Sequence, residues 1–226
     1  MASASPGRVS GVIQKPDHTC AEQEGGASRR GTGRANPTAA TDRRSVDHLT
    51  TAPRSDIEFA NGSLAAPEGL ATITVLDRHD ASGAKGLGLA RGFDIEKGAV
   101  ATTINPGMMN LLVFGADAES MAAAANRVIE LKGGIVVADE GEIVAEVATP
   151  LFGILSGSPS SEVTVGALAV ADAIRDVLGM TYDGLLTSIG FAALAVIIPE
   201  LKICDRGLVK VWRDRQEAVD FVVRRL

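Results

Sequence analysis

The chain has 226 residues, of which 46% are hydrophobic and 22% charged, and this composition is typical of a protein with a packed core. The formal net charge of −6 is unevenly distributed, because residues 56–226 hold fourteen Lys and Arg against twenty-three Asp and Glu. Phosphate groups are bound by clustered cations, so an acidic domain of this kind argues against a nucleic-acid partner or an anionic membrane surface.

Cysteine usage and hydropathy indicate a cytoplasmic protein. Cys20 and Cys204 are the two cysteines and lie far apart in the sequence, so neither a disulfide framework nor a CxxC metal site is expected. The longest apolar run, over 185–198, is shorter than the ~20 residues of a membrane span and contains Ser188 and Gly190. We therefore expect a soluble protein of a reducing compartment, without a membrane partner.

The N-terminal 55 residues differ in composition from the rest. They are rich in Ser, Thr, Gly, Ala, Pro and Arg and show no sustained apolar period of either 2 or 3.6. An organelle-targeting peptide would be poor in acidic residues, whereas this segment contains Asp17, Glu22 and Glu24. We predict a disordered arm over residues 1–55 and a folded domain over residues 56–226.

The first half of the folded domain predicts strands. Asn61-Gly62 is a strong signal for a hairpin between two short strands. Apolar segments then predict strands over 71–77, 86–93, 98–104 and 110–114. The segment GLGLARG lacks the spacing of a phosphate-binding glycine loop, so we interpret it as a strand or bulge with close backbone packing.

The apolar period then changes and predicts helices. Asp117 is placed to cap a helix over 117–132 that buries one stripe and ends at Gly133; the stripe consists of Met121, Ala124, Val128 and Leu131. The elements after it are a hairpin over 134–147 turning at Asp139–Gly141, a helix capped at Ser158-Pro159 and ending before Gly179, a helix over 182–193, and a hairpin turning at Asp205–Gly207. The predicted fold class is mixed α/β, in the α+β-like sense: a mixed sheet with hairpins and about three packed helices.

Five segments of the folded domain occur in the order and spacing of one known family. They are FANGSLAAPEGLATITVLDRH, GLGLARGF, KGAVATTI, NRVIELKGGIVVADEGEIVAEV and PELKICDRGLVKV. Together they resemble the C-terminal domain of bacterial adenine deaminases, over about residues 56–226. The resemblance implies that domain's fold. It also implies a link to amidohydrolases of purine catabolism, which convert adenine and water to hypoxanthine and ammonia.

The resemblance covers only the accessory part of such an enzyme. In the family, the chemistry lies mainly in a preceding (β/α)₈ barrel, where histidines, an aspartate and a bridging carboxylate hold two Mn or Fe ions. A two-metal site needs several converging imidazoles and carboxylates, and a barrel needs about 200 residues or more. This chain has three histidines, His18, His48 and His79, and 55 residues before the matching part. We expect no catalytic residue, metal ligand or cofactor in this chain itself.

The loop between strands 98–104 and 110–114 departs from the family pattern. Relatives carry approximately Ser-Thr-Val-Ala-His-Asp-Ser-His-Asn where this chain reads TTINPGMMN. The resemblance thus places Pro106 and Met109 at the two histidine positions and Gly107 at the aspartate position, and it retains Asn110. Pro and Met can neither bind metal through nitrogen nor relay protons, so the departure counts against adenine as the substrate.

Six residues are candidates for a pocket or an interface. Asp77, Arg78 and His79 follow a buried strand, relatives carry a similar acidic-Arg-His run, and Asn110 matches the family loop. The structural alternative is that Asp77 pairs with Arg78 while His79 caps backbone carbonyls. Met108 and Met109 are expected to be partly exposed beside a turn at Pro106-Gly107 and to form an interaction face; alternatively both fold back into the core.

Three functions are compatible with the sequence. In the first, the chain is a C-terminal part of an adenine-deaminase-like amidohydrolase. The barrel is then present in cis or in trans, and further copies of the chain are partners. Alternatively it is a free-standing module that binds a small nucleobase-like ligand or a partner protein. The third possibility is a vestigial folded domain. Whether the chain takes part in an enzymatic reaction is left open by these alternatives.

Overall fold

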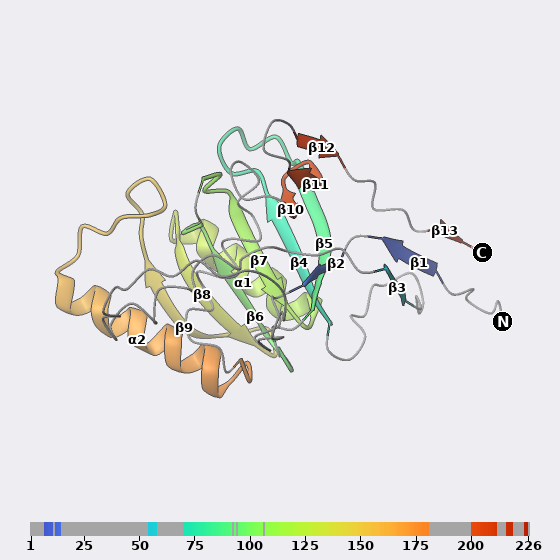
Figure 1. Ribbon diagram of the computed structural model, residues 1–226. Coiled ribbons are helices and arrows are strands. Elements are labelled where there is room, and N and C mark those ends of the chain that lie inside the picture. Colours follow the sequence, from blue (N-terminus) through green and yellow to red (C-terminus); the bar gives the residue numbers. More distant parts are fainter. Residues whose placement is uncertain are drawn as a thin grey trace, which may run out of the picture.

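The computed structural model describes residues 7–10, 12–14, 54–57, 70–91, 93, 95–105, 107–180, 200–211, 216–218 and 224–225. Among these residues the fold is mixed α/β, which confirms the predicted class (Figure 1). Six strands form an antiparallel sheet in the order β5-β4-β7-β6-β8-β9, and β2 lies parallel to β5 at one edge. A β10–β11 hairpin and two helices complete the described core.

The elements have the following bounds. The main sheet contains β2 (Val12–Gln14), β4 (Leu70–Leu76), β5 (Lys85–Arg91), β6 (Ala99–Thr102), β7 (Leu111–Gly115), β8 (Gly134–Asp139) and β9 (Glu142–Ala148). Two smaller sheets contain β10 (Glu200–Cys204), β11 (Gly207–Val211) and β12 (Gln216–Ala218), and β1 (Gly7–Ser10), β3 (Arg54–Ile57) and β13 (Arg224–Arg225). The helices are α1 (Ala118–Glu130) and α2 (Ser160–Asp176).

These bounds confirm the strands expected from the apolar pattern between residues 71 and 114, and both hairpins that turn at Asp139–Gly141 and Asp205–Gly207. The expected hairpin at Asn61-Gly62 and the expected helix over 182–193 lie outside the described residues. The division into 1–55 and 56–226 stays a prediction. Three short described strands, β1, β2 and β3, lie wholly or partly within the first 55 residues.

The centre of the sheet is buried on both faces. In β7, Leu111 and Val113 belong to one apolar cluster and Leu112 and Phe114 to the other. The first cluster contains Ala124 and Val128 of α1, and the second contains side chains of α2 and of the β10–β11 hairpin. Because successive side chains of a strand point to opposite faces, this arrangement produces three layers, with α1 on one side of the sheet and α2 with the hairpin on the other.

Helix α1 begins as the sequence predicts. The Asp117 side chain accepts a hydrogen bond from the backbone amide of Ser120 at 2.8 Å, which caps the first turn. The predicted stripe faces the sheet: Ala124 and Val128 are buried, and Met121 and Leu131 pack against the same cluster. Gly133 follows the helix with φ of +130°.

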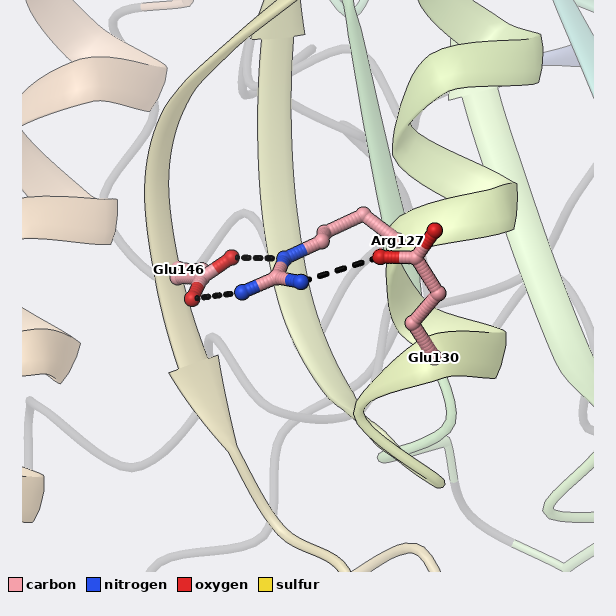
Figure 2. Close-up of polar contacts among 3 residues, drawn as sticks. All are labelled: Arg127, Glu130 and Glu146. Atoms are coloured by element: carbon pink, nitrogen blue, oxygen red, sulfur yellow. Dashed lines mark hydrogen bonds and ion pairs between the residues drawn. The ribbon is translucent and has the colours of Figure 1, made fainter.

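An ion pair joins the exposed side of α1 to the sheet. Arg127 donates to both carboxylate oxygens of Glu146 on β9, at 2.6 and 2.8 Å, and to Glu130 one turn along α1 at 2.9 Å (Figure 2). These hydrogen bonds lower the pKa of Glu146 below its usual value. All three side chains are partly exposed, so we assign the pair a role in aligning α1 with β9 and only a small share of the stability.

Helix α2 begins one residue later than predicted. The sequence suggested Ser158 as the cap and Pro159 as the first helical residue, but the helix starts at Ser160, and Pro159 occupies the cap position with an extended ψ of 141° and no side-chain cap bond. Ser158 is exposed and its amide bonds to Ser156 instead.

No helix among the described residues is long and apolar enough to cross a membrane.

The two glycines of GLGLARG allow the β10–β11 hairpin to approach β5 closely. Gly86 and Gly88 of β5 pair with Val75 and Ile73 of β4. A side chain at either glycine would therefore lie on the face of the sheet that the hairpin covers. A Cβ atom on Gly86 would lie 1.9 Å from the Cys204 carbonyl oxygen, and one on Gly88 would lie 3.3 Å from side chains of the hairpin. The expectation of close backbone packing at this segment is confirmed.

We expect Gly86→Ala to destabilise the domain by about 1–3 kcal/mol, because the added methyl group meets backbone atoms that cannot move independently. Urea denaturation followed by circular dichroism measures this change. Gly157→Ala is the matched control, since the nearest atom to its new Cβ lies 3.9 Å away, and its effect should stay within about 0.5 kcal/mol. Equal stability of the two variants would contradict the packing assigned to the hairpin.

Candidate functional site

Four loops meet at one end of the sheet, which we call the loop end: residues 77–84, 103–110, 149–157 and 205–206. The strand registers bring them together, because Leu76 pairs with both Leu111 and Lys85, and Gly134 at the start of β8 pairs with Ala148. The β10–β11 turn joins them through the contact of Cys204 with Gly86. All six candidate residues of the sequence lie in the first two of these loops.

Asp77 organises the first of these loops and does not pair with Arg78. Its carboxylate accepts the Ser82 hydroxyl at 2.5 Å and the backbone amide of Ser82 at 3.1 Å. It also accepts the amides of His79 and Asp80 at 3.0 and 3.3 Å. These hydrogen bonds, that of the Ser82 hydroxyl first, lower the pKa of Asp77 to about 2. The alternative of an Asp77–Arg78 ion pair is therefore wrong, and Asp77 holds its own loop in an Asx-type turn.

Arg78 joins two other loops. Its Nε donates to the carbonyl oxygen of Met109 at 2.5 Å, and a terminal guanidinium nitrogen donates to that of Phe152 at 2.5 Å. The guanidinium also covers the backbone of Gly153, where an added Cβ would lie 2.6 Å from Nη1. One planar, permanently charged group thus fixes the spacing between residues 109 and 152.

Asn110 and His79 extend the same network. The amide of Arg78 donates to Asn110 Oδ1, and Asn110 Nδ2 donates to Asp205 Oδ1 in the β10–β11 turn, both at 3.4 Å. His79 Nε2 lies 2.9 Å from the Met108 carbonyl oxygen. Because a carbonyl only accepts, this contact is a hydrogen bond when Nε2 is the donor, and such capping of a carbonyl agrees with the structural alternative.

The two methionines have different surroundings. Both are half-buried, and Met108 packs against Cys204 and Val211 of the hairpin. Met109 has a positive φ of 49°, which is uncommon for a residue with a side chain. Gly107 and Met108 form a turn, whereas the turn expected at Pro106-Gly107 cannot be compared in full because Pro106 lies outside the described residues. The partial exposure expected of both side chains is confirmed; their role in an interaction stays a prediction.

Asn105, Asp205 and Phe152 also lie at the loop end, but they were not among the candidate residues indicated by the sequence. Asn105 is buried and donates to the Asn110 carbonyl at 2.6 Å, while its Oδ1 finds no partner among the described residues. Phe152 is 81% exposed with φ of +58°. A Phe before a glycine resembles an ordinary core position in a sequence, so only the three-dimensional structure reveals that this side chain points outward.

The donor set of the described residues does not fit a two-metal centre. No group of three or more His, Cys, Asp or Glu side chains in the described part of the chain could hold a metal ion. The imidazole of His79 faces a carbonyl oxygen, and the Asp77 carboxylate is surrounded by the Ser82 hydroxyl and backbone amides. These side chains are thus engaged in hydrogen bonds within and between the loops of the loop end.

The sequence of this domain matches one known protein family. The model of the adenine deaminase C-terminal domain matches residues 47–215. This chain belongs to that family. The domain is 45% identical over 170 residues to an adenine deaminase of Cereibacter sphaeroides and 38% identical over 169 residues to one of Methylobacterium nodulans. A Brucella melitensis adenine deaminase is 38% identical over 139 residues.

The matched region makes up most of the length of this chain but less than a third of the length of each relative. The matches to the Cereibacter and Methylobacterium proteins cover 74% of this chain and 29% of each relative. The match to the Brucella protein covers 62% of the chain and 24% of the relative. Most of each relative therefore has no counterpart in the matched region, and the resemblance noted in the sequence is confirmed for this domain alone.

We expect Arg78→Ala to accelerate chymotryptic cleavage after Phe152 by about five-fold, because the loop loses a charge-assisted hydrogen bond, a loss of about 1 kcal/mol at a half-exposed site. Mass spectrometry of timed digests of the folded chain measures the rate. Arg127→Ala removes an arginine whose bonds are to α1 and β9, and it should leave this cleavage unchanged. A rate unaffected by Arg78→Ala would contradict the link between the two loops.

Proposed function

We propose that the chain serves as the accessory domain of an adenine-deaminase-like amidohydrolase of the cytoplasm and does not catalyse deamination alone. The catalytic portion is supplied by another polypeptide or by a longer product. The observation that carries this proposal is the family match over residues 47–215, combined with a coverage of 29% of the relatives. The relatives are named adenine deaminases as whole proteins, and this chain corresponds to one part of them.

The donors present support the assignment of catalysis to another portion. Hydrolytic deamination by a binuclear centre uses imidazole and carboxylate ligands to hold the ions and to generate the attacking hydroxide. The chain contains three histidines, and among the described residues the one histidine, His79, is hydrogen-bonded to a backbone carbonyl. Binuclear Mn or Fe chemistry therefore belongs to the catalytic portion, and no step is assigned to residues of this chain.

The loop 105–110 supports a role in contact and positioning. Asn110 and the Met108 and Met109 carbonyls are all engaged by Arg78, His79 or Asp205, so these bonds hold residues 108–110 in place. The side chains it offers are thioethers, which pack on irregular apolar surfaces and do not transfer protons. We infer that this loop covers the catalytic portion without supplying a reacting group, and that the substrate of the assembled enzyme differs from adenine or is bound without these residues.

The proposal predicts that the purified chain releases no ammonia from adenine in the presence of Mn²⁺ or Fe²⁺. It also predicts that the chain raises the deaminase activity of the Cereibacter sphaeroides enzyme truncated before its matching region, because a missing domain is restored. Ammonia release measured with and without an excess of the chain tests both statements. A heat-denatured sample of the chain is the control.

Two results would contradict the proposal. Turnover by the chain alone, with about two metal ions per molecule by elemental analysis, would place the catalytic site within it. Stoichiometric binding of a nucleobase to the chain, together with no effect on the truncated enzyme, would favour a free-standing binding module.

A further inference from the structure

The loop between β9 and α2 presents large apolar side chains to solvent. The exposed fractions are 49% for Leu151, 81% for Phe152 and 56% for Leu155. Ile104 on the neighbouring loop is 39% exposed, and it follows Thr103, which bonds to Gly153. In Figure 1 the connection between β9 and α2 lies on the left, beside the β9 edge of the sheet. Exposed apolar side chains gathered on one loop mark an interaction site more often than single ones do.

This loop is rigid although it is exposed. Leu151 and Leu155 exchange two backbone hydrogen bonds, each of 3.0 Å, which closes a tight turn with Phe152 near its tip. The Gly153 carbonyl accepts the Thr103 hydroxyl at 2.6 Å and the Thr149 hydroxyl at 3.0 Å. Arg78 binds the Phe152 carbonyl. Five hydrogen bonds thus fix the backbone that carries the exposed side chains, and a preformed surface loses little entropy on binding.

Phe152 is poorly suited to the fold at its own position. Its φ of +58° lies in the left-handed region, where glycine and asparagine are favoured and a bulky side chain is strained. Its side chain is 81% exposed, so packing within this domain returns little for that strain. A residue that costs the fold stability and contributes little to the core is explained by a contact outside the domain.

We propose that Leu151, Phe152 and Leu155 dock onto the catalytic portion of an adenine-deaminase-like amidohydrolase, with Phe152 inserted into an apolar pocket of that portion. This inference rests on the proposed function and names the surface that performs it. The catalytic portion is the chosen occupant because it makes up most of each relative's length outside the match. Arg78 acts as a positioning residue, since it holds the Met109 and Phe152 loops at a fixed spacing.

A second copy of the chain is a less suitable occupant. An isologous interface needs a surface that is complementary to itself. The exposed Leu151, Phe152 and Leu155 lie on one short closed turn, which offers a second copy few apolar contacts beyond these three side chains. A fixed turn with an exposed aromatic side chain suits a partner that supplies a pocket for it, as aromatic residues at the centre of interfaces do.

Titration calorimetry tests the inference with the 226-residue chain and the Cereibacter sphaeroides enzyme truncated before its matching region. Phe152→Gly should weaken binding at least about ten-fold, because the central aromatic contact is lost. Phe152→Asn, which tolerates the left-handed backbone with less added flexibility, should weaken it similarly. Phe152→Leu keeps an apolar side chain and should retain most of the affinity.

The stability of the same variants separates docking from a structural role. Phe152→Gly relieves the strained φ and should melt at the same temperature as the unchanged chain or higher, whereas loss of a core residue lowers the melting temperature. Val165→Ala is the matched control, because it trims an apolar side chain that is 68% exposed on α2, and it should leave binding unchanged.

Each other outcome overturns a defined part of the account. No binding by the unchanged chain would overturn the proposed function itself. Binding by Phe152→Gly equal to that of the unchanged chain would leave the proposed function intact and overturn this surface. A concentration-dependent dimer of the chain alone that Phe152→Gly dissociates would show that the occupant is a second copy.

Discussion

The burial of β7 on both faces is the constraint on which the rest of the structure depends. A strand whose successive side chains are all apolar must be covered on both sides of its sheet. Helix α1 supplies one cover, and α2 with the β10–β11 hairpin supplies the other. The hairpin can lie close enough only because Gly86 and Gly88 have no side chains in its path. Both covers leave the loops at the end of the sheet accessible, and one of these loops carries the exposed Leu151, Phe152 and Leu155.

The loop end is held together mainly by bonds to backbone groups. Arg78 binds the Met109 and Phe152 carbonyls, His79 faces the Met108 carbonyl, and Asp77 accepts amides of its own loop. Side chains used in this way are not free to bind ions or to relay protons. They do, however, fix the conformation of the surface that the loops present. The same network supports the proposal that the domain contacts a partner through these loops.

Local patterns predicted most of the described fold because they act over short distances. The Asp117 cap, the turn at Asp139–Gly141 and the glycine alternation before Arg91 each follow from a few neighbouring residues. The start of α2 was misplaced by one residue, since Pro159 satisfies the backbone requirements of a cap as well as those of a first turn.

The candidate site was predictable only in part. Family resemblance indicated residues 77–79 and Asn110, but their partners are mostly backbone carbonyls and amides, which every residue possesses and no sequence pattern distinguishes. Phe152 was missed for a related reason, because its exposure depends on how loops far apart in the sequence are packed.

Docking of these loops onto a catalytic portion can be tested by amide hydrogen exchange of the chain, measured alone and with the truncated Cereibacter sphaeroides enzyme. If the loops dock as proposed, exchange slows over 151–155 and 107–110 in the mixture and stays unchanged in α2. Protection confined to α2, or no protection at all, would show that these loops do not form the interface.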